Sequence, residues 1–118
     1  MARKDDLGRW GEDVASQHLL DSGYAVIERN WRCPSGEIDI IALEKGQLVF
    51  VEVKTRSGLA FGHPFEAITA QKLARLRRLA IAWCVAHPNR YRDFRIDAIA
   101  VVAPRGQIPT VEQLSGLF

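Results

Sequence analysis

Hydrophobic and polar residues alternate most regularly in the middle of the chain. Two apolar runs, residues 38–43 and 48–53, lie on either side of a polar break at residues 44–47. β-Branched residues recur in both runs and the break contains Gly46, a pattern typical of two strands joined by a tight turn. The centre of the chain is therefore expected to form a β-hairpin.

The turn of this hairpin decides which side chains meet. If residues 45–46 form the turn, Asp39 faces Glu52, and in the same register Glu37 faces Lys54. Opposed strand residues have Cβ atoms roughly 4.5–5.5 Å apart, and like charges there destabilise a sheet. A divalent cation with hard oxygen ligands would relieve this repulsion. The sequence thus predicts a cation site at Asp39 and Glu52, whereas a slip by one residue would put the two acids on opposite faces.

The rest of the apolar pattern predicts helices and further strands around the hairpin. Helical spacing of apolar residues occurs on both sides of it, and residues 92–102 alternate as a strand. This order favours an α/β fold, one mixed sheet flanked by helices, in a single domain over residues 1–118. The expected elements outside the hairpin are a helix capped by Asp5 or Asp6 and running to about Asp21 with Gly23 as its stop, a strand over 24–30, a loop over 30–36, a loop over 57–65, a helix over 69–87 capped by Thr69 and ended by Pro88, a strand over 92–102, and a short strand or turn within 104–118 that covers a sheet edge.

Glu12 in the first helix lies among small and apolar residues rather than on the polar face. Its helical strip contains Gly8 and Leu19. Glycine weakens a helix, so Gly8 and Gly11 are expected to permit a close backbone approach beside Glu12. Two interpretations stay open: Glu12 belongs to the hairpin site, or it is a structural carboxylate that pairs with Arg9 or reaches water.

Charge is divided unevenly along the chain, although the net charge is only +2. Residues 1–66 carry eight Lys and Arg against eleven Asp and Glu, net −3, whereas residues 70–105 carry eight against two, net +6. The basic second half suits a polyanion such as nucleic acid, with Lys72, Arg75 and Arg78 on one helix face. A basic face that only favours solubility is the alternative.

The composition argues against membrane and disulfide-rich classes. No apolar run approaches the ~20 residues needed to span a bilayer, and the N-terminal residues lack the apolar segment of a signal peptide. We therefore expect a cytoplasmic protein with no membrane partner. Cys33 and Cys84 have no C-x-x-C spacing, so reduced thiols are expected, and a single disulfide is the alternative.

The acidic residues occur in an order that resembles a nuclease pattern. A cation held by carboxylates beside a lysine suits phosphodiester hydrolysis, and a Glu, then an Asp, then Glu-x-Lys across helix, strand and strand resembles the PD-(D/E)XK nuclease superfamily. More closely, the chain resembles the YraN family of small bacterial proteins regarded as endonucleases, whose fold is similar to that of Holliday junction resolvases. The motifs that carry this resemblance are G-x-x-G-E at 8–12, RNWR at 29–32, GEIDII at 36–41, FVEVKTR at 50–56, FGHP at 61–64, and Arg95 and Asp97 in the last predicted strand.

The resemblance implies a restriction-endonuclease-like α/β/α core and an endonuclease that depends on Mg²⁺ or Mn²⁺. Asp39 and Glu52 would hold the metal, with the Val53 carbonyl as a further ligand. Lys54 would be the catalytic lysine. Glu12 would be an outer ligand or an acid that orients water.

Further residues are expected to line this site. They are Glu37, from the hairpin register, and Gln71 and Lys72, from the resemblance. The chain departs from the superfamily pattern at Ile38, which stands where a proline precedes the aspartate, and that position is structural. Because resolvases act as two-fold dimers, the resemblance also implies a homodimer by analogy.

Three functions follow from these patterns. The first is a metal-dependent endonuclease that hydrolyses phosphodiester bonds in DNA, in particular branched or single-stranded DNA. The second is a nucleic-acid-binding module on a nuclease fold that does not cleave. The third is a protein-interaction subunit that uses a sheet edge. Each catalytic position holds an acid or a lysine, which favours the first function over the second.

Overall fold

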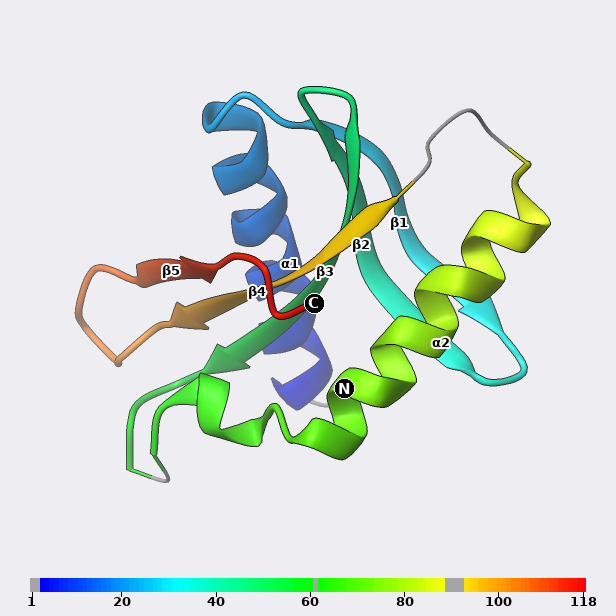
Figure 1. Cartoon of the computed structure of the whole chain (residues 1–118). Coiled ribbons are helices and arrows are strands. Elements are labelled where there is room, and N and C mark those ends of the chain that lie inside the picture. Colours follow the sequence, from blue (N-terminus) through cyan, green and yellow to red (C-terminus); the bar gives the residue numbers. More distant parts are fainter. Residues whose placement is uncertain (1–2, 61, 89–92) are drawn as a thin grey trace.

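The computed structural model describes residues 3–60, 62–88 and 93–118. Within these ranges five strands form one mixed sheet in the order β1-β2-β3-β4-β5 (Figure 1). Neighbouring strands are antiparallel except β3 and β4, which are parallel and joined by the connection that contains a helix. The strands are β1 (Ala25–Cys33), β2 (Gly36–Glu44), β3 (Gln47–Arg56), β4 (Phe94–Val102) and β5 (Thr110–Leu114).

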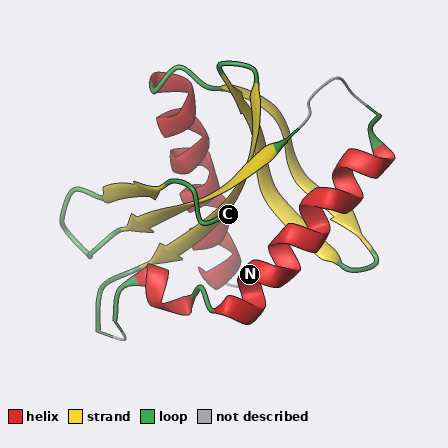
Figure 2. Ribbon diagram, viewed as in Figure 1, coloured by secondary structure: helices red, strands yellow, loops and turns green. Residues whose placement is uncertain are grey.

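Helices α1 (Arg3–Asp21) and α2 (Ala70–Ala86) cover opposite faces of the sheet (Figure 2). The apolar core is divided accordingly, because successive strand residues point to opposite faces. Leu19 of α1 packs with Val49 on one face, and Leu79 of α2 packs with Phe50 on the other. The predicted α/β fold, a mixed sheet flanked by helices, is confirmed.

The hairpin forms with the predicted turn. Lys45 and Gly46 have positive φ angles of 49° and 83°, as a two-residue turn that follows strand twist requires. Glu44 pairs with Gln47 and Ile41 pairs with Phe50, as expected from that turn.

The helix ends are partly as predicted. Thr69 caps α2 by accepting a hydrogen bond from the Lys72 backbone N–H at 3.2 Å, and Gly23 follows α1 with a φ of 92°. The expected start of α1 at Asp5 or Asp6 is wrong, since the helix already includes Arg3. Arg and Lys are good helix formers, so the helix extends before both aspartates.

The predicted loop over residues 30–36 is also wrong. Strand β1 continues to Cys33 because its last residues pair with β2, and the turn is limited to residues 34–35. The expected start of the later strand, Arg92, lies outside the described residues, as does Phe61 of the FGHP motif. Strand β5 covers the outer edge of β4, as predicted for the C-terminal segment.

Cys33 and Cys84 are free thiols rather than a disulfide. Burial raises the pKa of the Cys84 thiol. Among the helices in the described ranges, none combines the length and the apolar character that crossing a membrane requires.

Candidate active site

The site begins where strands β2 and β3 part. Their backbone pairing runs from Glu44 and Gln47 to Ile40 and Val51. One residue further, the Asp39 side chain replaces a backbone partner, because the Val53 N–H donates to its Oδ2 at 2.8 Å. The opening between the two strands is therefore bridged by a carboxylate.

Asp39 also contacts the second acid of the predicted pair. Burial, a hydrogen bond with Glu52 and repulsion from Glu52 together raise the pKa of Asp39 to about 9, although the Val53 N–H acts in the opposite direction. Glu12 raises this pKa further. Near neutral pH and without a cation, Asp39 therefore keeps a proton, and its carboxyl can share it with Glu52.

The backbone of β1 is distorted next to Asp39. Asn30 has a φ of 54°, in the left-handed region, and lies between the paired residues Arg29 and Trp31. Its side-chain amide donates to Glu12 Oε1 at 2.8 Å and to Glu37 Oε1 at 3.1 Å. Sequence reasoning missed this role, although asparagine is one of the residues that tolerate such a φ and is rare within strands.

Glu12 reaches this group because α1 approaches β3 closely. A Cβ on Gly11 would lie only 2.7 Å from Thr55 Cγ2, whereas a Cβ on Gly8 would meet nothing within 4 Å. The expected close approach is thus confirmed at Gly11 and wrong at Gly8, which instead leaves space beside Glu12. The cation beside Glu12 is Arg29, at 3.6 Å, rather than Arg9.

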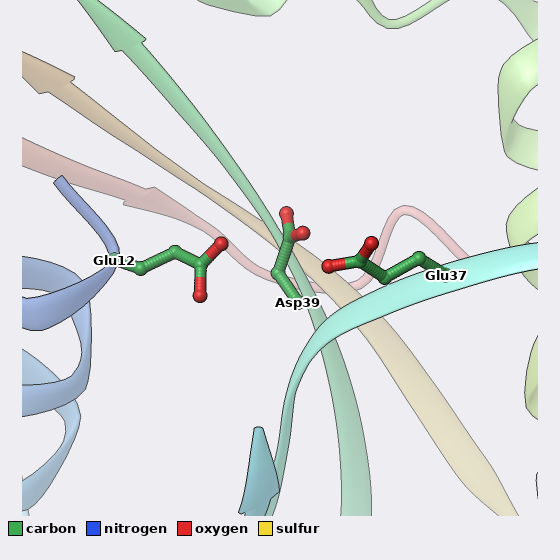
Figure 3. A group of neighbouring side chains, drawn as sticks. All are labelled: Glu12, Glu37 and Asp39. Carbon is green, nitrogen blue, oxygen red and sulfur yellow. The ribbon is translucent and has the colours of Figure 1, made fainter. Parts of the chain in front are cut away.

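Three carboxylates converge at this point. Oxygens of Glu12, Glu37 and Asp39 lie within 4.8 Å of one another, and Figure 3 shows Glu12 and Glu37 directed toward Asp39 from opposite sides. We call these three residues the acid cluster. Oxygen ligands of this kind suit hard divalent cations such as Mg²⁺, Mn²⁺ and Ca²⁺. The acid cluster can therefore hold a metal ion.

Glu37 and Glu52 both lie beside Asp39. Glu37 was expected only to line the site, yet it belongs to the acid cluster. Glu52, expected as a ligand, is 8% exposed and contacts Asp39 from the β3 side. Val53 and Asp39 both line a separate, smaller cleft of about 240 Å³.

A cleft of about 530 Å³ brings most of the expected catalytic residues together. We call it the acid cleft. Lys54 of β3 and Arg75 of α2 lie in its wall, so both signs of charge face the same space. Lys72, Arg78 and Gln71 are not among its walls in the described part of the chain. The charged residues that line it are Arg32, Glu37, Asp39, Glu52, Lys54 and Arg75.

Comparison with known proteins gives a consistent family assignment. A UPF0102 protein of Clavibacter michiganensis is 55% identical over 112 residues, which is 95% of each chain. A UPF0102 protein of Beutenbergia cavernae is 54% identical over 117 residues, 99% of each chain. The model of Uncharacterised protein family UPF0102 matches residues 11–101, a range that contains the acid cluster and Lys54. The chain therefore belongs to the UPF0102 family.

Proposed function

We propose that this protein is a metal-dependent endonuclease that hydrolyses phosphodiester bonds in DNA. The observation that carries the proposal is the convergence of Glu12, Glu37 and Asp39 at the edge of a cleft that Glu37, Asp39 and Lys54 line together. A scaffold gains nothing from three acids in contact. Phosphodiester hydrolysis requires such a group for a cation and positive charge for the phosphoryl oxygens.

The residues divide into distinct roles. The acid cluster would hold Mg²⁺ or Mn²⁺, which when bound supplies a Lewis acid for the phosphoryl oxygen. Glu52 contacts Asp39 and so orients its carboxyl. Lys54 supplies positive charge to the phosphate or to the leaving oxygen. Arg75, in the wall of the same cleft, would hold the DNA strand by its phosphate.

The motif order supports the same function. A Glu, an Asp and a Glu-x-Lys resemble the PD-(D/E)XK nucleases, and their places on α1, β2 and β3 match that pattern. A homodimer, as in the resolvases that share this likeness, is part of the proposal by analogy.

The test is cleavage of a substrate panel. Duplex, single-stranded, flapped and four-way-junction DNA are incubated with Mg²⁺ or Mn²⁺ and with EDTA. Asp39→Asn and Lys54→Met should each reduce the cleavage rate by about 100-fold or more. Asp21→Asn is the matched control, because it removes a carboxylate from the far end of α1.

The outcomes separate the candidate functions. Cleavage that persists in Asp39→Asn and Lys54→Met would come from a contaminating nuclease. Binding that falls with salt but is never followed by cleavage would favour the non-cleaving module, for which the basic residues Arg75 and Arg78 on α2 are the structural argument.

A further inference from the structure

A second cleft, of about 840 Å³, lies on the other side of the acid cluster between α1 and β1. We call it the arginine cleft. It shares Arg32 and Glu37 with the acid cleft, so the two lie next to one another. The charged and amide side chains that line it are Arg9, Glu12, Asp13, Arg29, Asn30, Arg32 and Glu37.

The backbone at Asn30 explains why two arginines of one strand share this cleft. In a regular strand, residues three positions apart point to opposite faces. Arg29 and Arg32 are three apart, yet both line the arginine cleft. The positive φ of Asn30 lies between them and interrupts the alternation.

Both arginines are paired with acids that the cation site would use. Arg32 Nε contacts Glu37 Oε2 at 3.1 Å, and its side chain is 78% exposed. Arg29 lies 2.8 Å from Asp13 and 3.6 Å from Glu12. Exposed ion pairs of this kind are weak and exchange readily with other partners.

We propose that Arg29 and Arg32 form a phosphate-binding surface for the nucleic-acid strand that extends from the acid cleft into the arginine cleft, and that cation binding makes them available. A cation at the acid cluster takes over Glu12 and Glu37. The guanidinium groups then lose part of their pairing and bind phosphate, for which their planar donors are suited. The availability step rests on the proposed cation site.

The ligand is a strand rather than a single nucleotide. Cationic side chains lie on both sides of the acid cluster, Arg75 and Lys54 in one cleft and Arg29 in the other, with Arg32 between them. A strand that crosses both clefts places phosphates against each. The substrate class is therefore a single strand, or a strand at an opened duplex, that extends in both directions from the bond at the acid cluster.

The experiment measures binding without cleavage. Fluorescence anisotropy follows a labelled single strand of about 15 nucleotides in Ca²⁺ and in EDTA at equal ionic strength. In Ca²⁺, Arg32→Gln and Arg29→Gln should each weaken binding about five-fold and lower the salt slope by about 0.7. In EDTA the loss should be smaller, because the arginines are already engaged with carboxylates.

Matched variants separate this role from general charge and folding effects. Arg105→Gln removes the same charge from the exposed β4–β5 connection and should change binding much less. Arg32→Lys keeps the charge and should keep the salt slope. Deoxyadenosine monophosphate, added as competitor, should displace the strand only at a far higher concentration than an unlabelled strand.

Two results would overturn the proposal: equal losses for Arg32→Gln and Arg105→Gln, or no binding of the strand in either condition. Equal arginine losses in Ca²⁺ and EDTA would overturn the availability step. Arginine-dependent binding without cleavage in Mg²⁺ or Mn²⁺ would leave the phosphate surface standing and count against the endonuclease. Cleavage together with binding that does not depend on the two arginines would support the endonuclease and count against the phosphate surface.

Discussion

Gly11 of α1 lies against Thr55 of β3 so closely that no side chain fits between them. Gly8, one turn earlier, faces open space. Gly11→Ala should therefore lower the free energy of unfolding by about 1–3 kcal/mol through overpacking. Gly8→Ala should raise it by up to about 1 kcal/mol, because alanine is the better helix former. Urea denaturation measures both.

The pair of glycine variants also tests how Glu12 is positioned. A shift of α1 away from Thr55 would move Glu12 away from Asn30, which holds it at 2.8 Å. Gly11→Ala should then weaken Mn²⁺ binding, measured by calorimetry, and Gly8→Ala should not. Equal stability and equal metal affinity in the two variants would contradict the close packing.

Asp39 makes the stability of the metal-free protein depend on pH. Its pKa is raised from 3.8 to about 9 in the folded protein, first by burial and then by Glu52. The folded state thus binds an extra proton between these values, and its stability falls as pH rises from about 4 to about 9. Asp39→Asn mimics the protonated acid, so in EDTA its advantage should grow with pH to at least about 1 kcal/mol at pH 8. Parallel stability curves for the two proteins would refute the perturbed carboxyl.

Metal binding should offset the loss of stability that the Asp39 carboxylate causes as pH rises. Mn²⁺ that binds only the folded protein should stabilise it by about 2.7 kcal/mol at about 100 times its Kd, and EDTA should remove the gain. Glu37→Gln should reduce the gain, because Glu37 is one of the three clustered acids. Asp21→Asn should leave it unchanged. A melting temperature that does not respond to Mn²⁺, measured by differential scanning fluorimetry, would exclude the cation site.

The sequence was most informative where apolar and polar residues alternated regularly. Alternation from residue 38 to 53 predicts the hairpin, and the turn residues predict its register, which the pairing of Ile41 with Phe50 confirms. The encounter of Asp39 with Glu52 follows from the same count, although here side chains rather than the backbone complete the contact.

The part of the site that the sequence did not predict depends on Asn30, where the strand alternation breaks. The positive φ of Asn30 interrupts the alternation along β1, so Arg32 reaches a cleft shared with Arg29, and the Asn30 amide donates to both Glu12 and Glu37. Strand alternation carries no information about such a break. Asn30, at the boundary between a predicted strand and a predicted loop, was the only local sign of this break.

The buried pair of Arg95 and Asp97 should contribute to stability rather than to catalysis. Asp97 is fully buried and accepts hydrogen bonds from Arg95 at 2.8 and 3.0 Å and from Gln113 and the Gly116 N–H. Asp97→Asn should cost about 3 kcal/mol, because it removes the buried charge that Arg95 contacts at 2.8 Å and leaves the arginine, among the described residues, only its ion pair with Glu44. Asp13→Asn, in the exposed pair with Arg29, should cost less than about 1 kcal/mol.

The pH dependence of this pair is opposite to that of Asp39. Burial alone would raise the pKa of Asp97, but hydrogen bonds from Arg95, the Gly116 N–H and Gln113 lower it below its usual value. Its stabilisation is therefore present above about pH 4 and is lost as pH falls through the lowered pKa. The stability gap between wild type and Asp97→Asn should narrow in acid. A gap that is constant down to acid pH would show that Asp97 is not held ionised.

Asn30 combines a backbone role and a side-chain role, and two variants separate them. Asn30→Gly keeps the freedom to adopt a φ of 54° but loses the amide that bridges Glu12 and Glu37. Asn30→Ala loses the amide and also strains the backbone, so it should be less stable than Asn30→Gly by about 1–2 kcal/mol. Both should weaken Mn²⁺ binding to a similar extent, because both leave the two glutamates without their common donor. If alanine is as stable as glycine, the left-handed backbone is not required at this position; if metal binding survives both substitutions, the amide does not position the acid cluster.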